Sequence, residues 1–191
     1  MPARDAFCSS CGAAYADTTG YPRRCGVCGL QKWANPIPVS VVLCSVVHPA
    51  RPGRVGLLCV RRGIEPKKGK LALVGGFLEE HETVAQGGVR EVREEAGVVI
   101  DPATVAPFWF TSTKPVPDRV LLFSLAATLP VTALVPYAPS PEASERGLVF
   151  GSRGLDEMFA FPLHVEAVRR FYAALGDAHG GGDGDADWLP C

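Results

Sequence analysis

The sequence has no uninterrupted apolar run long enough to cross a membrane. Its longest apolar stretch, residues 121–137, is broken by Ser124, Thr128, Pro130 and Pro136, whereas a spanning helix needs about 20 predominantly apolar residues. The first six residues also contain no apolar secretion signal. We therefore expect a cytoplasmic protein that does not associate with a membrane.

Neither sign of charge dominates the composition. The chain has 19 Lys and Arg residues against 20 Asp and Glu residues, which gives a net charge of -1. A protein that binds nucleic acid through bulk electrostatics is normally basic, so the composition argues against nucleic acid as the main partner. With 47% hydrophobic residues among 191, the chain can form one ordinary domain with its own core and a small appendage.

Cysteine is concentrated near the N-terminus. Two Cys-x2-Cys pairs lie within the first 28 residues, and they consist of Cys8, Cys11, Cys25 and Cys28. In a chain without a secretion signal, this spacing is typical of metal binding rather than of disulfides. Four thiolates satisfy tetrahedral Zn²⁺ and leave no open position, so such a site is structural. We predict a zinc ribbon over residues 1–34, with redox-active pairs or an unmetallated loop as the alternative.

The hydrophobic pattern after residue 35 predicts a mixed α/β arrangement of strands and two helices. We expect strands at 39–47, 55–60, 71–74, 98–100, 108–111, 120–128 and 148–150, and helices at 83–96 and 165–175. These elements define one domain over residues 35–173. Residues 174–191 are rich in Gly and Asp, which predicts a flexible acidic tail.

The helix expected at 83–96 has an apolar face and an acidic face. At 100° per residue, Glu91, Glu94 and Glu95 share an arc of about 100°. Like charges at this spacing destabilise a helix, so they indicate either a solvated charged face or a bound cation. Gly87 and Gly88 in the middle of the helix cost about 1 kcal/mol each relative to Ala, which predicts a close backbone approach there.

The spacing of residues on both sides of the three glutamates favours a bound cation over a solvated charged face. The pattern Gly-x5-Glu-x7-Arg-Glu-Val-x-Glu-Glu-x-Gly-Val, from residue 76 to residue 98, resembles the Nudix box without a mismatch. Its fixed polar and glycine positions are occupied by Gly76, Glu82, Arg90, Glu91, Glu94, Glu95 and Gly97. The resemblance implies an α/β/α sandwich around a mixed sheet, and hydrolysis of a nucleoside diphosphate linked to another moiety.

The resemblance also implies roles for the box residues. Glu91, Glu94 and Glu95 are expected to hold Mg²⁺ or Mn²⁺, and Glu82 to support the site from the preceding loop. Arg90 would orient a glutamate through a charge-assisted hydrogen bond. Gly76 would shape the loop before the helix and is also a candidate backbone ligand of the metal. We expect Glu91 to act as the general base.

Residues outside the box give further candidates. Arg62 and Lys70 precede the box and could contact phosphate, although a solvated basic loop explains them equally well. Trp109 and Phe110 could stack on adenine, but alternating aromatic residues on a strand more often belong to the core. Glu142 and Glu145 fall where relatives with a ribbon often have a late acidic residue, and Glu145 is our candidate for a catalytic role there.

The ribbon followed by residues 33–36 is similar to the zinc-ribbon subgroup of Nudix proteins. That subgroup includes NADH pyrophosphatases and FAD or ADP-ribose pyrophosphatases, and its members are often homodimers. Residues 108–115 lack the Ser-Gln-Pro-Trp motif of the NADH pyrophosphatases, which favours a FAD or ADP-ribose type of substrate over NADH. Two alternatives remain, a regulator that binds nucleotide or nucleic acid without hydrolysis, and an enzyme that decaps dinucleotide-capped RNA.

Overall fold

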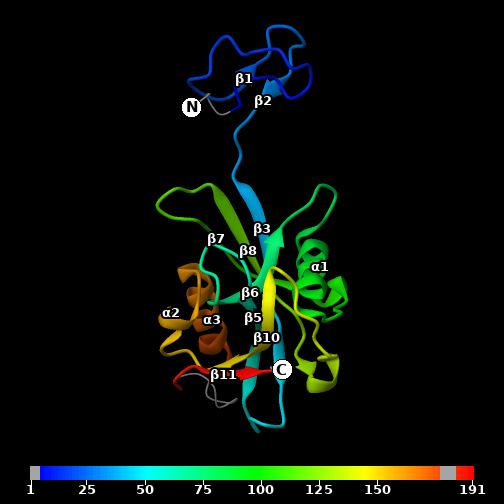
Figure 1. Ribbon diagram of the computed structural model, residues 1–191, viewed down its shortest axis with the longest axis vertical. Helices are drawn as coiled ribbons and strands as arrows, with labels where there is room; N and C mark the ends of the chain where they lie inside the picture. Colours follow the sequence, from blue (N-terminus) through cyan, green and yellow to red (C-terminus); the bar gives the residue numbers. More distant parts are fainter. Residues whose placement is uncertain (1–4, 177–183) are drawn as a thin grey trace. The chain divides into compact units, whose positions relative to one another are not determined.

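The computed structural model describes residues 5–176 and 184–191, and it divides the chain into two compact units (Figure 1). The first unit, Met1–Pro36, contains a two-stranded antiparallel sheet of β1 (Arg23–Arg24) and β2 (Gln31–Lys32). Its buried hydrophobic residues are only Cys8, Tyr15 and Cys25 among the described positions. So small a cluster requires an additional stabilising element.

The second unit, Ile37–Cys191, is built around one mixed sheet. Its strands are β3 (Ile37–Leu43), β4 (Ser45–Val47), β5 (Val55–Arg62), β6 (Leu71–Phe77), β7 (Ala106–Ser112), β8 (Arg119–Leu125), β9 (Leu129–Pro130), β10 (Ala143–Phe150) and β11 (Asp187–Pro190). The main path has the order β11-β10-β5-β6-β3-β8-β7. β3 and β8 are parallel, and the other neighbours on this path are antiparallel.

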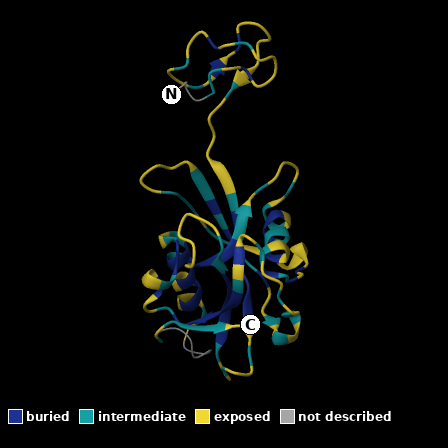
Figure 2. Ribbon diagram, viewed as in Figure 1, coloured by how far each residue is buried: buried dark blue, intermediate teal, exposed yellow. Residues whose placement is uncertain are grey.

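Helices cover both faces of this sheet (Figure 1). α1 (Val84–Ala96) packs on one face, and α2 (Leu155–Met158) and α3 (Pro162–Leu175) lie on the other. Two short 3₁₀ helices, η1 (Pro102–Thr104) and η2 (Val131–Ala133), lie in the connections. Alternation along the strands supplies one hydrophobic cluster to each face, and the buried residues concentrate in the sheet (Figure 2). The expected α/β/α sandwich with a mixed sheet is therefore confirmed.

α1 begins and ends as its sequence predicts. Thr83 and Gln86 form a capping box at its N-terminus, and Gly97 ends it in the left-handed conformation with φ of 68°. The two mid-helix glycines are explained by packing. A Cβ on Gly88 would lie 2.5 Å from Val42 Cγ2, and a Cβ on Gly87 would lie 2.4 Å from Leu78 Cδ2. The prediction of a close approach at this point of the helix is confirmed.

The C-terminal segment differs from the expected flexible tail over 174–191. α3 continues to Leu175, and Asp187–Pro190 forms β11, which pairs antiparallel with β10. Residues 177–183 lie outside the described part of the chain. The tail prediction is thus wrong for 187–190, because Trp188 and Leu189 pack against the hydrophobic clusters despite their acidic, glycine-rich flank.

Residues 98–100 also depart from expectation, because they form no strand although Val98 and Ile100 are buried. Within the described residues, no helix has the length and apolar character needed to span a membrane.

Candidate active site

The acidic face of α1 lies against the end of β6, where two glycines leave room for carboxylates. A Cβ on Gly76 would lie 2.4 Å from Glu91 Oε1, so the glycine allows the Glu91 carboxylate to rest against the strand. The backbone N–H of Gly75 is directed at Glu95 Oε2 across 3.4 Å. Glu91 and Glu95 therefore converge on one point of the sheet, as the helical spacing predicts.

Arg90 links the box residues to one another. Its guanidinium donates two hydrogen bonds to Glu82, Nε to Oε1 at 2.8 Å and Nη2 to Oε2 at 3.1 Å. Nη1 donates to Glu91 Oε1 at 2.7 Å and to Glu94 Oε2 at 3.2 Å, and Nη2 also reaches the Phe77 carbonyl at 3.0 Å. With both side chains 18% exposed, the forked Arg90–Glu82 contact holds its geometry better than a surface ion pair.

The carboxylates of Glu91 and Glu95 are partly buried and repel each other. Burial, together with repulsion from Glu91 and Glu142, raises the pKa of Glu95 to about 7, although the Gly75 N–H and the charge of Arg62 act in the opposite direction. Burial also raises the pKa of Glu91, in spite of the Arg90 contact. Two partly buried carboxylates that disfavour their own ionisation form a site that a divalent cation would stabilise.

Of the two late acidic residues, the structure brings Glu142 and not Glu145 toward α1. Glu142 adds to the repulsion that raises the pKa of both Glu91 and Glu95. The backbone N–H of Gly63 donates to the Glu142 carbonyl at 2.7 Å, which ties this segment to the end of β5.

The structure places the candidate Glu145 on the other face of the sheet from the α1 carboxylates. Its carboxylate accepts from Arg61 Nε at 2.6 Å, and it lies opposite Arg61 in the β10–β5 register. The register shifts between Ala143 and Glu145. Without this bulge Glu145 would share the α1 face with Ala143, and with it the side chain turns to the α3 face.

The four candidates for substrate binding, which are Arg62, Lys70, Trp109 and Phe110, lie in different surroundings. Arg62 lies close enough to Glu95 to lower its pKa, and its Nε donates to the Pro66 carbonyl at 2.9 Å. Lys70 instead donates to the carbonyl of Glu157 on α2. Phe110 is 72% exposed on β7.

The ring of Trp109 packs against two other side chains of the protein. The ring stacks on Phe123 with centroids 5.0 Å apart, and the Arg170 guanidinium lies 4.4 Å from its centroid. Of the two interpretations of Trp109, the core one agrees with this packing.

A buried arginine that the sequence analysis did not single out as a site residue supports the C-terminus of α1. Arg146 is 2% exposed, and its guanidinium donates to the carbonyls of Ala96 at 2.8 Å, Val135 at 2.9 Å and Cys191 at 3.2 Å. A cation at a helix C-terminus complements the helix dipole. Arg146 therefore fastens the last turn of α1 to the connection before β10 and to the end of the chain.

In the first unit, the four N-terminal cysteines lie together. One sulfur from each of Cys8, Cys11, Cys25 and Cys28 lies within 4.8 Å of all the others. The backbone N–H groups of Val27 and Cys28 point at Cys25 Sγ across 3.4 and 3.5 Å. Backbone hydrogen bonds from residues 11 and 10 lower the pKa of Cys8 to about 6. Four convergent sulfurs, with backbone N–H groups directed at Cys8 and Cys25, have the donor set that tetrahedral Zn²⁺ requires.

Comparison with known proteins agrees with this arrangement. Residues 38–150 match the family model of the NUDIX domain. The chain belongs to the Nudix family, so the assignment made from the box spacing is confirmed.

Two curated relatives match parts of the sequence. A 97-residue segment is 33% identical to the NAD-capped RNA hydrolase NudC of Stutzerimonas stutzeri, covering 50% of this chain and 32% of that protein. A 43-residue segment is 46% identical to the ADP-ribose pyrophosphatase of Methanocaldococcus jannaschii, covering 22% of this chain and 25% of that protein. The chain thus aligns with a third or less of the length of each.

Solved structures share the fold. The crystal structure of a NUDIX hydrolase from Nitrosomonas europaea superposes with a TM-score of 0.63 at 24% identity, covering 93% of this chain and 94% of that one. The NUDIX domain of Shewanella oneidensis NrtR complexed with ADP ribose superposes with a TM-score of 0.57 at 18% identity, covering 75% and 90%. At these identities the structures establish the fold alone.

Proposed function

We propose that this protein is a metal-dependent Nudix pyrophosphohydrolase that cleaves a nucleoside diphosphate linked to another moiety and releases a nucleoside monophosphate. The observation that carries the proposal is the convergence of Glu91 and Glu95 at the end of β6, with Arg90 joined to both Glu82 and Glu91. A divalent cation site needs carboxylates that are held close together in fixed positions despite their repulsion. A solvated charged face does not need this arrangement.

In this proposal Glu91, Glu94 and Glu95 hold Mg²⁺ or Mn²⁺. The bound cation would polarise the phosphate and lower the pKa of a water molecule. Arg90 keeps Glu91 and Glu94 in position, and Glu82 in turn fixes Arg90. Glu91 is our candidate base, and Glu142, which raises the pKa of both Glu91 and Glu95, can add a further carboxylate. Arg62 is the candidate cation for the substrate phosphates, because it already acts electrostatically on Glu95.

For the substrate, we propose a nucleoside diphosphate derivative of the FAD or ADP-ribose type. The similarity to an ADP-ribose pyrophosphatase supports this choice, as does the absence of the Ser-Gln-Pro-Trp motif. Trp109 is packed against Phe123, so we retain Phe110 as the candidate for stacking on a base. The cytoplasmic location and the homodimer remain predictions.

We also propose that the four cysteines hold a structural Zn²⁺. The support is the donor set, since four sulfurs converge in a unit whose described hydrophobic cluster has three members. Because the site would be closed by four thiolates, it would stabilise the ribbon without taking part in hydrolysis.

Removal of the cap from NAD-capped RNA is a second candidate function. The 33% identity to a NAD-capped RNA hydrolase supports it, and the reaction would use the same carboxylates. An RNA substrate would be distinguished by cleavage that weakens steeply as the salt concentration rises.

Product identification tests the proposal. The full chain would be incubated with Mg²⁺ or Mn²⁺ and with FAD, ADP-ribose, NADH, NAD or NAD-capped RNA, and the products read by mass spectrometry. We expect one substrate to yield a nucleoside monophosphate and its partner phosphate, and we expect Glu91→Gln and Glu95→Gln to lower kcat by about 10²-fold or more.

Glu166→Gln is the matched control, because Glu166 lies on α3 and pairs with Arg170. Nucleotide binding without cleavage of any substrate would favour the non-catalytic regulator instead.

A further inference from the structure

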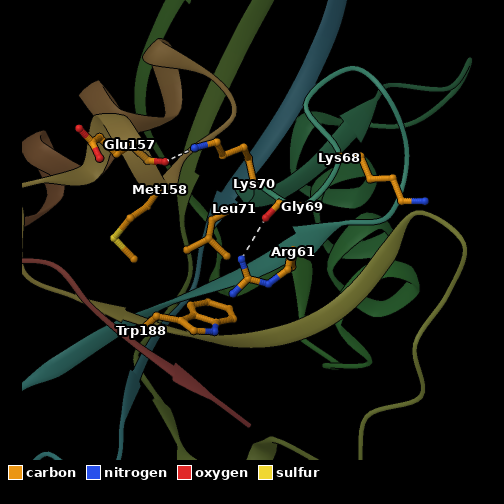
Figure 3. Close-up of a pocket in the computed structure, with 8 residues that line it drawn as sticks. All are labelled: Arg61, Lys68, Gly69, Lys70, Leu71, Glu157, Met158 and Trp188. Carbon is orange, nitrogen blue, oxygen red and sulfur yellow. Dashed lines mark hydrogen bonds between the residues drawn. The ribbon is translucent and has the colours of Figure 1, made fainter.

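A cavity lies on the face of the sheet that carries α2 and α3 (Figure 3). Its volume is about 320 Å³, and it is lined by Arg61, Lys68, Gly69, Lys70, Leu71, Glu157, Met158 and Trp188. Along β5, Leu57 and Cys59 belong to the α3-side cluster, whereas Leu58 and Val60 belong to the α1-side cluster. Arg61 continues the first series, so the sheet separates this cavity from Glu91 and Glu95.

Positive charge dominates the wall formed by the β5–β6 connection. Lys70 donates to the main-chain carbonyl of Glu157, and Figure 3 shows the Glu157 carboxylate turned away from it. Throughout residues 5–176 and 184–191, no carboxylate lies within ion-pair distance of Lys68 or Lys70. Arg61 is compensated by Glu145 at 2.6 Å, and its Nη1 donates to the Gly69 carbonyl at 3.0 Å. The cavity wall therefore keeps an excess of positive charge.

The opposite wall is apolar and includes a flat aromatic surface. Trp188 on β11 lies beneath the Arg61 guanidinium, 5.4 Å from ring centroid to Cζ, and Leu71 and Met158 complete this wall (Figure 3). An anionic group and a planar apolar group on one ligand would match the two walls. Small-molecule pockets range from about 300 to 1,000 Å³, so this cavity, at the lower end of the range, matches a mononucleotide better than a dinucleotide.

We propose that this cavity is a second binding site for a nucleoside monophosphate. The phosphate would lie at Lys70 and Arg61, and the base would lie against Trp188. The site does not depend on the proposed hydrolysis, because it lies on the other face of the sheet and needs no divalent cation.

Calorimetry with AMP tests the site. The full chain would be titrated without added Mg²⁺ or Mn²⁺, and without a chelator that could remove metal from the cysteines. We expect one AMP per chain, binding weakened roughly tenfold in Lys70→Gln by loss of a charge-assisted contact, and much weaker binding of adenosine. Lys114→Gln is the matched control, because Lys114 lies in the connection between β7 and β8.

Fluorescence supplies a second readout. AMP should quench the wild-type emission and leave that of Trp188→Phe unchanged, since Trp33 and Trp109 lie outside the cavity. Glu91→Gln should bind AMP as the wild type does. The proposal is overturned if AMP does not bind, if Lys70→Gln binds it with unchanged affinity, or if Glu91→Gln abolishes binding. A protein that binds AMP here but cleaves no dinucleotide would contradict only the proposed function.

Discussion

Gly75 and Gly76 are adjacent on β6 but face different surroundings. A Cβ on Gly75 would lie 2.3 Å from the Ser40 carbonyl oxygen and 2.7 Å from Val41 Cα, which are backbone atoms of β3. The three atoms nearest to a Cβ on Gly76 would all belong to the Glu91 carboxylate, with Oε1 at 2.4 Å. Backbone in the middle of a sheet cannot move aside, whereas the end of a glutamate can.

We therefore predict opposite outcomes for two alanine substitutions. Gly75→Ala should lower the free energy of unfolding by about 1–3 kcal/mol or more through overpacking. Gly76→Ala should keep the wild-type stability within about 1 kcal/mol and displace Glu91, which would lower kcat by about 10²-fold. Urea unfolding and the hydrolysis assay measure the two effects. Wild-type activity in Gly76→Ala would contradict a catalytic position for Glu91.

At the residue scale, the sequence predicts the box accurately because the residues are fixed by one helix and the strand before it. Helical geometry alone places Glu91 and Glu95 on one face. The choice between Glu142 and Glu145 depends on a bulge in β10, and a single extra residue reverses the face of every side chain after it. Local sequence does not show which of two neighbouring strands will bulge.

At the scale of elements, His164 fastens α3 to β6. Its Nδ1 accepts a hydrogen bond from the backbone N–H of Leu73 at 3.1 Å, and Phe123 and Phe161 contact its ring edge-on. Burial, assisted by the charge of Arg62, lowers the pKa of His164 to about 4. The imidazole is therefore neutral in the native state, with its proton on Nε2.

This contact predicts a loss of stability in acid. Unfolded His164 titrates near its ordinary pKa of about 6.5, so between pH 6.5 and 4 the unfolded state binds the extra proton. The free energy of unfolding should fall as the pH drops through this window, by up to roughly 3 kcal/mol from this residue.

Urea unfolding at pH 7.5 and pH 5 measures this loss of stability in the wild type and in His164→Gln. The glutamine can accept the hydrogen bond from the Leu73 N–H but does not titrate. The wild type should lose more stability than the variant. An equal loss in both proteins would show that other groups cause the acid sensitivity.

The elements that local sequence predicts best are those whose pattern is strong over a long segment. α1 has a cap at Thr83, a stripe and a terminal glycine, and its observed bounds of Val84–Ala96 agree with the expected 83–96. β10 begins at Ala143, before the strand expected at 148–150, because its pairing with β5 and not its composition makes the added residues a strand. β11 is missed for the same reason, since its partner residues in β10 lie 37 to 43 positions earlier in the chain.

At the scale of the molecule, the two units are stabilised in different ways. The second has a hydrophobic cluster on each face of its sheet, whereas the described part of the first buries Cys8, Tyr15 and Cys25. The folding of the first unit should therefore depend on bound metal, whereas the folding of the second unit should not.

Removal of zinc should unfold residues 5–36 and leave the second unit folded. We expect one Zn²⁺ per chain, lost in Cys11→Ser and retained in Cys191→Ser, because Cys191 is not among the four clustered cysteines. A colorimetric zinc assay gives the stoichiometry, and limited proteolysis after chelation should add cleavage sites before residue 37 and none within residues 37–176. Full zinc content in Cys11→Ser would exclude the four-cysteine site.

The order of strands in the sheet has a consequence for synthesis on the ribosome. By the end of α1 at Ala96 the chain contains β3, β5 and β6, but the partners of the outer edges come later, β8 on β3 and β10 on β5. At about 5–20 residues per second, translation from Ala96 to Phe150 takes several seconds. During that interval β3 and β5 each have an unpaired edge in the nascent sheet, and both strands consist largely of residues that are buried in the finished fold. Such edges are templates for pairing with other chains. A nascent chain stalled just after α1 should therefore be the form of this protein that most needs a chaperone.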